Sequence, residues 1–448
     1  MAASRSKDVN SITISIPEAH SLALKCHMNE LMTEAEMLYR KVLDAAPETL
    51  DTLHFLGVLC HQQGRNDEAA ELIGRIIRIA PDNFDAHNNL GNVYQALKMP
   101  DKAEECYRKA IAINPGHAPA HNNLGVNLMV LDRPEEAEEF YLEAVKLSPD
   151  TPEHHFNLGN AYRRMGKYDG AIDAYTNAVG LKPDYLGAWQ GLARCYLQSG
   201  RREEAVQVFD NLILLNPDNP VFSYLRSACL GTDVPERTPD DYLQHLFDES
   251  ATQFDKHLEL LEYRAPSLLC EALVVALPTS DASRDILDAG CGTGLCGPLL
   301  RPYARSLEGV DISSGMLSVA SGRQIYDRLY KSEITQFMST CGQQYDVVAS
   351  ADTLCYFGDL RKVFEAASVV LAHDGLFGFT LEDCGDKGQT YQLNTTGRYT
   401  HAKGYVEAEL AASGFALVTY NSVELRSEAK LPVSGHLFVA QKVNRVQG

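Results

Sequence analysis

Residues 286–295 read ILDAGCGTGL, an apolar run that leads into a turn with three glycines and then into an expected helix. Glycines let the backbone come close to a ligand, and nucleotides bind at the first strand edge of a doubly wound sheet. Gly290, Gly292 and Gly294 follow the spacing GxGxG, whereas the dinucleotide fingerprint GxGxxG would need a small residue at Leu295. The stretch therefore predicts a nucleotide-like cofactor but departs from the pattern for NAD.

Two carboxylates near this loop narrow the choice of cofactor. Asp288 sits just before the glycines, where its charge would repel a pyrophosphate and attract an ammonium or sulfonium group. Asp311 lies 21 residues beyond Gly290, at the end of the next apolar run, and could accept hydrogen bonds from two ribose hydroxyls. Either acid alone could be a surface residue or a helix cap. Together with the loop they favour S-adenosyl-L-methionine as cofactor.

Apolar, strand-like runs alternate with helical segments on both sides of the loop. They lie at residues 286–290, 307–312, 345–350, 376–382, 415–420 and 436–442. Alternation of this kind predicts a mostly parallel α/β sheet.

The first half of the chain has a different period. Glycines recur at a constant step at Gly57, Gly91, Gly125 and Gly159, and prolines keep the same step from Pro47 to Pro217. With the accompanying Ala and Tyr positions this is the tetratricopeptide pattern, which predicts an α-solenoid. We expect six repeats over residues 16–219, a linker over 220–240 and an α/β domain over 241–448.

Asparagines recur on the first helix of successive repeats. They are Asn89, Asn123 and Asn157, accompanied by Asn92 and Asn160. An amide can donate to and accept from a peptide backbone, so the series predicts a groove that binds a protein or peptide partner. The alternative is that these asparagines merely solvate a concave surface. His87, His121 and His155 also recur, at a position that packs between helices, and we expect them to be structural.

The glycine loop and the acidic strand end resemble class I S-adenosylmethionine-dependent methyltransferases, with LDAGCGTG as motif I and the acidic end of LEGVDIS as motif II. The whole arrangement is similar to a bacterial-type family of predicted methyltransferases that carry tetratricopeptide repeats. The resemblance covers about residues 240–448, including HLFDESATQFDKHLELLEYRAP and GRYTHAKGYVEAELAASGF. It implies a seven-stranded Rossmann-like sheet and leaves the substrate open.

The resemblance also implies roles for particular residues. Asp288 would lie near the methionine end of the cofactor, above Gly290, Gly292 and Gly294, and Asp311 would lie on the ribose. The adenine would be flanked by Ile312 and Met316, while Glu333 would accept from its amino group with Ile334 alongside.

The segment that precedes the glycine loop is expected to form a helical lid. Phe247-Asp248 and Phe254-Asp255 are seven residues apart, which places them two helical turns apart on one face. A lid would exclude water, and Arg264 could pair with the methionine carboxylate of the cofactor. Ordinary core packing is the alternative for the two phenylalanines.

Methyl transfer from a sulfonium mainly requires alignment of the acceptor, and a base is needed if the acceptor is protonated. Asp352 follows the fourth expected strand, at the rim where the methyl group would meet its acceptor. Tyr399 and His401 are further candidates for catalytic groups. Arg398 could anchor an anionic substrate.

The amino-acid composition narrows the possible partners, metal sites and cellular location. Lys and Arg number 40 and Asp and Glu number 60, so the formal charge of −20 disfavours a nucleic acid or an anionic membrane as partner. Eleven cysteines without CxxC spacing indicate reduced thiols and no zinc or other metal site. Because no apolar run has the length of a signal peptide or a membrane span, we expect a cytoplasmic protein.

These observations favour a methyltransferase whose repeats recruit a protein partner or substrate. One alternative is a binding scaffold whose second domain senses the cofactor or is inactive. Another is a methyltransferase of small molecules that uses its repeats for assembly. The residues of the glycine loop cannot distinguish catalysis from sensing.

Overall fold

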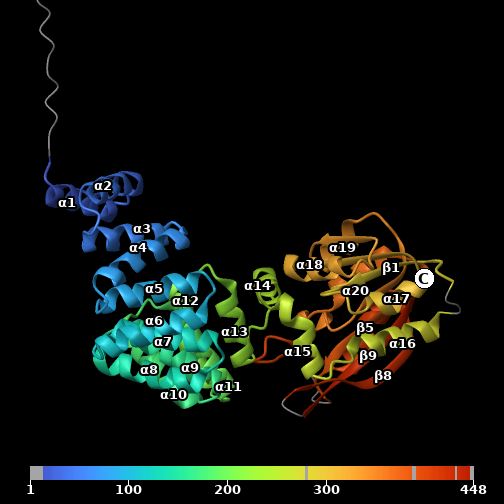
Figure 1. The fold of residues 1–448 in the computed structure, drawn as a ribbon. Coiled ribbons are helices and arrows are strands. Elements are labelled where there is room, and N and C mark those ends of the chain that lie inside the picture. Colours follow the sequence, from blue (N-terminus) through green and yellow to red (C-terminus); the bar gives the residue numbers. More distant parts are fainter. Residues whose placement is uncertain (1–13, 278–280, 386–389, 429–430, 444–448) are drawn as a thin grey trace, which may run out of the picture. The chain divides into compact units, whose positions relative to one another are not determined.

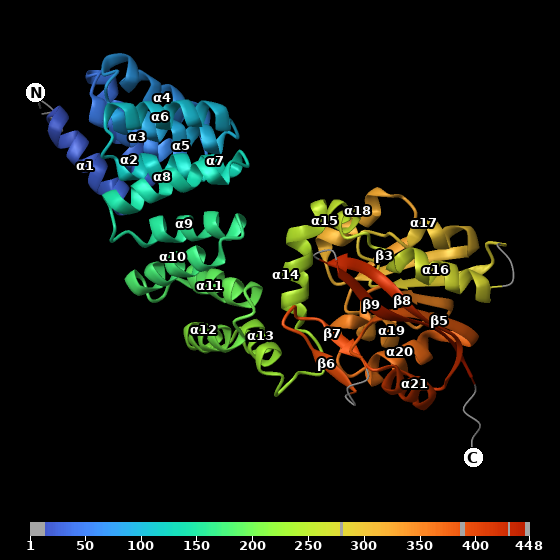
Figure 2. The same cartoon turned by 90° about the horizontal axis from the view of Figure 1, so that it is seen from below.

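The computed structural model describes residues 14–277, 281–385, 390–428 and 431–443. Its chain divides into two compact units, the first ending at Arg201 and the second beginning at Arg202 (Figures 1 and 2). Within the described residues, every strand belongs to the second unit.

The first unit is an array of antiparallel helix pairs. Its helices are α1 Ile16–Met28, α2 Met32–Ala45, α3 Leu50–Gln62, α4 Asn66–Ile79, α5 Phe84–Ala96, α6 Pro100–Ile113, α7 Ala118–Val130, α8 Pro134–Leu147, α9 Pro152–Arg164, α10 Tyr168–Leu181 and α11 Leu186–Gln198. The odd-numbered helices begin at a constant interval along the chain, and the even-numbered ones keep the same interval. The predicted repeat solenoid is confirmed.

Glycine marks the point of close approach within the pairs that begin with α3, α5, α7 and α9. A Cβ atom added to Gly91 would lie 2.5 Å from the ring of Tyr107, and one added to Gly125 would lie 2.6 Å from the ring of Tyr141. Both rings are almost fully buried. The aromatic ring of the second helix therefore fills the space that the glycine of the first helix leaves open.

The second unit begins with two more helices, α12 Arg202–Leu215 and α13 Pro220–Leu230. The second of these corrects the expected linker, because most of residues 220–230 is helical and only the following stretch is irregular. The start of α13 at Pro220 follows the start of α11 at Leu186 by one repeat period, so the period continues into this helix. Tyr224 on α13 donates a hydrogen bond to the Gly397 carbonyl (2.8 Å), which ties the helix to the α/β part of this unit.

The helices that follow α13 form the expected lid region. They are α14 Asp240–Ser250, the 3-10 turn η1 Ala251–Gln253, α15 Phe254–Leu260 and α16 Ala265–Ala276. We call residues 240–260 the lid. The rings of Phe247 and Phe254 meet edge to face at 5.9 Å across the turn between α14 and α15.

The sheet of the second unit has nine strands within the described residues. These are β1 Arg284–Ala289, β2 Ala304–Asp311, β3 Arg328–Lys331, β4 Tyr345–Ser350, β5 Leu371–Asp383, β6 Tyr391–Leu393, β7 Tyr399–His401, β8 Phe415–Glu428 and β9 Leu431–Lys442. The strands β3-β2-β1-β4-β5 run parallel, and β9 and then β8 continue antiparallel from β5.

The expected number of seven strands is therefore corrected. Seven strands form the predicted Rossmann-like sheet, and the short pair β6 and β7 is added where β7 joins the end of β5. The extra pair exists because β5 extends past the end of β4 and leaves backbone groups that β7 can pair with.

Alternating residues of the central strands face two separate cores. Leu287, Val348 and Phe377 belong to one hydrophobic cluster, whereas Ile286, Val347 and Leu376 belong to another. The remaining helices of this unit are α17 Gly297–Leu300, η2 Arg301–Tyr303, α18 Ser314–Gly322, α19 Ile334–Thr340, η3 Leu354–Tyr356, α20 Arg361–Val370 and α21 Lys403–Ala412. Helices cover both faces of the sheet, as expected of a doubly wound fold (Figure 1). Among the described residues, no helix is long and apolar enough to span a bilayer.

Candidate functional site

A cavity of about 580 Å³ opens at the carboxyl ends of the parallel strands of the second unit. This is the edge of an open α/β sheet at which ligands bind. Residues from the glycine loop, the ends of β2 and β4 and the lid all contribute to its lining. Of the expected cofactor residues, the lining includes Asp288, Gly290, Gly292, Asp311, Ile312, Met316, Glu333 and Ile334.

In the glycine loop after β1, Gly290 lies in a crowded position and Gly292 in an open one. Gly290 has φ +78°, and an added Cβ would lie 2.3 Å from the side chain of Thr353. Gly292 has φ +54°, but nothing lies within 4 Å of an added Cβ there. The backbone of the loop therefore presents a bare surface at Gly292, which suits close approach of a ligand. Gly294, with φ +88°, is packed against Tyr326 and does not line the cavity.

Asp288 is buried at the end of β1, beside the loop. Tyr326 donates a hydrogen bond from its hydroxyl to Oδ2 of Asp288 (2.6 Å). Burial raises the pKa of Asp288 to about 7, and the nearby Asp311 adds to this effect, while the bond from Tyr326 opposes it. A cationic ligand in the cavity would relieve the cost of charging this carboxyl group. Asp288 thus fits the methionine end of S-adenosyl-L-methionine.

Asp311 links the glycine loop to the start of α18. Its Oδ2 accepts from the backbone N–H of Gly292 (2.9 Å), and its Oδ1 accepts from the backbone N–H of Ser313 (2.8 Å). Burial raises the pKa of Asp311 above its ordinary value, while these bonds oppose the shift. The carboxylate orients the loop and retains further lone pairs for a ligand hydroxyl.

Glu333 caps α19 and lines the cavity at the same time. Its two oxygens accept from the backbone N–H groups of Thr335 and Gln336 at 2.9 Å each, and Oε1 lies 3.2 Å from Arg237. Both oxygens are therefore already engaged, and a bond from an adenine amino group would have to share one of them. Ile334, next to it, is buried in the cavity wall.

Two lid carboxylates hold the lid against the cofactor loops. Asp248 on α14 accepts from the hydroxyl of Ser313 (2.6 Å) and from the backbone N–H of Gly315 (2.8 Å). Asp255 on α15 accepts from the hydroxyl of Thr293 (2.6 Å) and forms an ion pair with Arg323. In the two predicted Phe-Asp pairs, the phenylalanines therefore line the cavity and the aspartates hold the lid in place.

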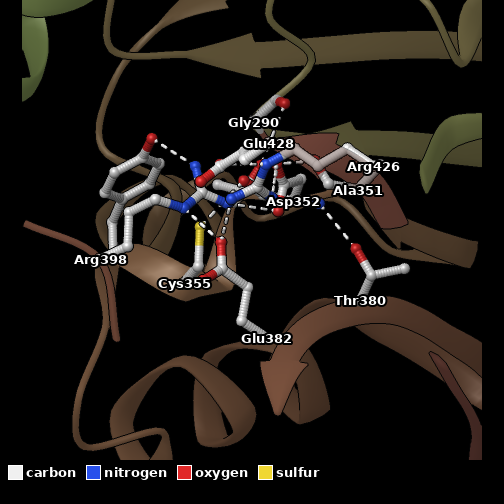
Figure 3. A network of polar contacts seen from close by, with 11 residues as sticks. Gly290, Ala351, Asp352, Cys355, Thr380, Glu382, Arg398, Arg426 and Glu428 are labelled. Atoms are coloured by element: carbon white, nitrogen blue, oxygen red, sulfur yellow. Dashed lines mark hydrogen bonds and ion pairs between the residues drawn. The ribbon is translucent and has the colours of Figure 1, made fainter. Parts of the chain in front are cut away.

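Asp352 follows β4 with φ +55°, a conformation that is rare for residues other than glycine, and Thr353 after it contacts Gly290 of the glycine loop. Its carboxylate pairs with Arg398 and lies 3.6 Å from Nη1 of Arg426 (Figure 3). Burial raises the pKa of Asp352 above its ordinary value, although both arginines pull it down. Asp352 lines the cavity.

Three expected site residues lie elsewhere. Arg264 is exposed at the start of α16, outside the cavity lining, because its neighbours Tyr263 and Pro266 take the inward positions instead. Tyr399 is fully buried on β7 and donates to the carbonyl of Pro235 (2.7 Å). His401 is fully buried on β7 and contacts the carbonyl of Gly358 through Nε2 (3.2 Å). Tyr399 and His401 do not reach the cavity because the strand pair β6 and β7 packs both of their side chains into the interior.

His401 also has the wrong acid–base character for catalysis from this position. Burial lowers its pKa to about 4, so the ring is neutral throughout the physiological range.

Several residues of the cavity were not expected from the sequence. Arg426 comes from a segment without a recognisable motif, and long-range folding brings it to the cavity. Tyr326, which bonds to Asp288 from behind the cavity wall, also has no local signal. A local signal was available only for Asp248 and Asp255, whose spacing matched that of the lid phenylalanines.

The asparagines of the first unit bond to one another between repeats. Asn123 donates to Oδ1 of Asn88 and of Asn92 (3.1 Å each), and Asn157 donates to Oδ1 of Asn122 (2.8 Å). All of the expected groove residues, Asn89, Asn92, Asn123, Asn157 and Asn160, remain partly exposed. Tyrosines also donate to Asn92 and Asn160 (2.7 Å each). The series is thus a continuous amide network across the repeats.

The recurring histidines have the structural role that the sequence predicts. His87, His121 and His155 each contact a proline carbonyl six residues earlier through Nε2, at 2.8–3.0 Å. Trp189, one period later, makes the same bond to Pro183 at 2.9 Å.

A parallel sheet that ends in an antiparallel pair, a glycine loop after its first strand and an acidic residue at the end of its second define a class I methyltransferase domain. Residues 260–422 match the family model described as "Methyltransferase domain". Residues 84–117, 116–184 and 162–229 match "Tetratricopeptide repeat" models, and residues 57–98 match a "TPR repeat" model. The chain is a tetratricopeptide-repeat protein that carries a methyltransferase domain.

Among curated proteins, the human Methyltransferase-like protein 27 is 44% identical over 86 residues, which are 19% of this chain and 35% of that protein. The Malonyl-[acyl-carrier protein] O-methyltransferase of Acetivibrio thermocellus is 31% identical over 142 residues, 31% of this chain and 48% of that protein. The chain therefore spans at most about half the length of these relatives. A crystal structure of the MamA protein, 26% identical, covers 38% of this chain and 93% of its own, with a TM-score of 0.35.

Proposed function

We propose that the protein is an S-adenosyl-L-methionine-dependent methyltransferase whose repeats recruit a protein partner or substrate. The observation that carries the proposal is the cavity beside the open face of the glycine loop, with the buried carboxyl groups of Asp288 and Asp311 at its wall. When bound, the cofactor supplies an electrophilic methyl group on a sulfonium. Every other requirement would be met by residues of the chain.

The cavity supports this chemistry in three ways. Asp288 and Asp311 offer negative charge and hydrogen-bond acceptors beside the loop. The lid, fastened by Asp248 and Asp255, would exclude water and hold the acceptor close to the reacting carbon. Asp352, paired with Arg398, would orient the acceptor, and as a carboxylate could take a proton from it.

For the repeats, the support is the asparagine network with its partly exposed amides. A partly exposed amide can both donate and accept, which suits the backbone of an extended segment. The sensing scaffold and the small-molecule enzyme with repeats for assembly remain the rival proposals. They differ in whether methyl transfer occurs and whether a partner is captured.

The first experiment is calorimetric titration with S-adenosylmethionine and S-adenosylhomocysteine, of the wild type and of Asp311→Ala. The substitution removes bonds worth about 1.5–3 kcal/mol for a charged group, so we expect affinity to fall by about 10- to 150-fold. Glu365→Ala, at an exposed position on α20, is the control and should bind as the wild type does. Unchanged affinity of Asp311→Ala would refute its cofactor role.

A second experiment distinguishes an enzyme from a sensor. Labelled methyl groups are supplied to a lysate with the wild type or with Asp352→Asn. Label transferred by the wild type and strongly reduced in the variant supports an enzyme. Cofactor binding without any transfer would favour the sensing scaffold.

A further inference from the structure

Arg398 and Arg426 line the cavity in an ion-pair network that lies near Gly290 of the glycine loop (Figure 3). Arg426 is buried and the side chain of Arg398 is 16% exposed. Arg398 donates from Nε to Oε1 of Glu382 (2.5 Å) and pairs with Asp352. Arg426 donates from Nη2 to the same oxygen of Glu382 (2.7 Å). Glu382 and Asp352 each lie against both guanidinium groups.

The guanidinium of Arg426 is incompletely satisfied by this network. The side chain is 5% exposed, and its Nη1 has no hydrogen-bond partner within the described part of the chain. The nearest carboxylate oxygen to Nη1, Oδ2 of Asp352, is 3.6 Å away. A buried charged donor without a partner is costly, so a ligand that supplies an acceptor would be bound strongly.

A third carboxylate already competes for Arg426 from the rim of the cavity. Glu428 accepts from Nε of Arg426 (2.7 Å), yet its side chain is 47% exposed. Both residues line the cavity. Glu428 can move into solvent at little cost. The carboxylate of a ligand can therefore replace the carboxylate of Glu428 beside Arg426.

The wall beside Arg426 is apolar. The backbone N–H of Ser427 donates to the carbonyl of Leu261 (2.7 Å), and that of Arg264 donates to Leu425 (2.8 Å), so the lid's end lies against this part of β8. Leu258, Leu261 and Tyr263 from this segment line the cavity. Burial also raises the pKa of Asp352, so this carboxylate takes up a proton more readily when the carboxylate of a ligand enters the cavity.

We propose that the cavity accepts substrates with a carboxylate on an apolar body, and that the guanidinium groups of Arg426 and Arg398 recognise this carboxylate. Glu428 competes with the substrate for Arg426. This inference rests on the proposed function, because it assigns the substrate class of the same cavity. An amine would instead be drawn to the carboxylates of the network, which is the outcome that the experiment must distinguish.

The experiment is calorimetric titration of the full chain, saturated with S-adenosylhomocysteine, with straight-chain carboxylates from acetate to octanoate. The matched primary amides and primary amines serve as neutral and cationic probes. We expect carboxylates to bind, with affinity rising with chain length, and amides of equal length to bind at least about tenfold more weakly.

Two substitutions in the network should act in opposite directions. Arg426→Gln should weaken carboxylate binding about tenfold or more, since it removes the charge that the ligand needs. Glu428→Gln should tighten carboxylate binding by about two- to fivefold, since it removes an exposed competitor. Arg361→Gln, which removes an exposed arginine paired with Glu409 on α21, is the matched control and should change nothing.

The outcomes separate the two levels of the proposal. If the wild type does not bind S-adenosylhomocysteine, the proposed function itself fails. If it does, then carboxylates that bind no better than amides, tighter binding of amines, or a Glu428→Gln variant with unchanged or weaker carboxylate binding each overturns the substrate assignment. Since Glu428 is exposed, its variant tests the proposal even if Arg426→Gln fails to fold.

Discussion

Asp288 is a carboxyl group that burial brings into the physiological titration range. Its pKa of about 7 follows first from desolvation and then from the neighbouring Asp311. In the free protein the group is protonated below pH 7 and ionised above it. A cationic ligand favours the ionised form, so proton release and ligand binding are linked.

We therefore expect the affinity for S-adenosylmethionine to rise by about tenfold between pH 6 and pH 8, the range over which one group of pKa near 7 loses its proton. Calorimetry at pH 6, 7 and 8 measures this. In Asp288→Asn the slope should vanish, because the amide does not titrate. A wild type whose affinity is independent of pH would show that Asp288 does not face the cationic end of the ligand.

At the scale of helices, the repeats depend on one small residue in each pair. The ring of Tyr107 occupies the space next to Gly91, whereas nothing lies within 4 Å of a Cβ added to Gly180 on α10. The same substitution at these two glycines should therefore have opposite effects.

Gly91→Ala should destabilise the protein by about 1–3 kcal/mol, the usual cost of overpacking a filled core. Gly180→Ala should stabilise it by about 0.5–1 kcal/mol, because alanine loses less backbone entropy in a helix. Thermal unfolding followed by circular dichroism measures both. If Gly91→Ala were as stable as Gly180→Ala, the close approach of the helices would not be the reason for the glycine.

The lid is a second element whose position depends on few bonds. Asp248 holds α14 to the start of α18. Its hydrogen bonds with Ser313 and Gly315 lower the pKa of the carboxyl group, so this carboxylate stays ionised at neutral pH.

Asp248→Asn should loosen the lid, since a charge-assisted pair of bonds becomes a neutral one that is about half as strong. Hydrogen exchange of the amides of residues 240–250 should accelerate, and S-adenosylhomocysteine should bind about tenfold more weakly, a loss of about 1.4 kcal/mol. Asp241→Asn, at an exposed position of the same helix, is the control. Equal exchange in both variants would show that Asp248 does not fasten the lid.

At the scale of the whole molecule, one chain carries two units. The residues that we propose to hold the cofactor all belong to the second unit and the asparagine network to the first. Our proposal thus assigns partner capture to one unit and chemistry to the other, and the two should be separable by mutation.

The joint substitution of Asn89, Asn123 and Asn157 by alanine should leave the affinity for S-adenosylmethionine within about twofold and reduce capture of partner proteins. Affinity capture with quantitative mass spectrometry, next to calorimetry, measures both. Asn177→Ala, exposed on α10, is the control, and circular dichroism checks that the repeats stay folded. Unaltered capture would leave the amides with a solvating and structural role.

The sequence by itself determined the two architectures and the part of the cavity wall that the glycine loop and the strand ends form. The constant period of the repeats, the glycine loop and the acids Asp288 and Asp311 are local patterns, because helix spacing, turn geometry and strand ends depend on residues that are close in the chain. The expectation that Phe247 and Phe254 lie on one helical face is wrong, because the turn η1 separates α14 from α15, although both side chains line the cavity.

Only the tertiary structure decided what each polar side chain does. Whether Tyr399 and His401 reach the cavity depended on the extra strand pair β6 and β7, which buries them. Arg264 points outward, whereas Arg426, much later in the chain, lines the cavity. Both positions depend on how the segment after the lid packs against β8. Burial and long-range pairing fix the charge, orientation and partners of a side chain, and neither is encoded in the local pattern around it.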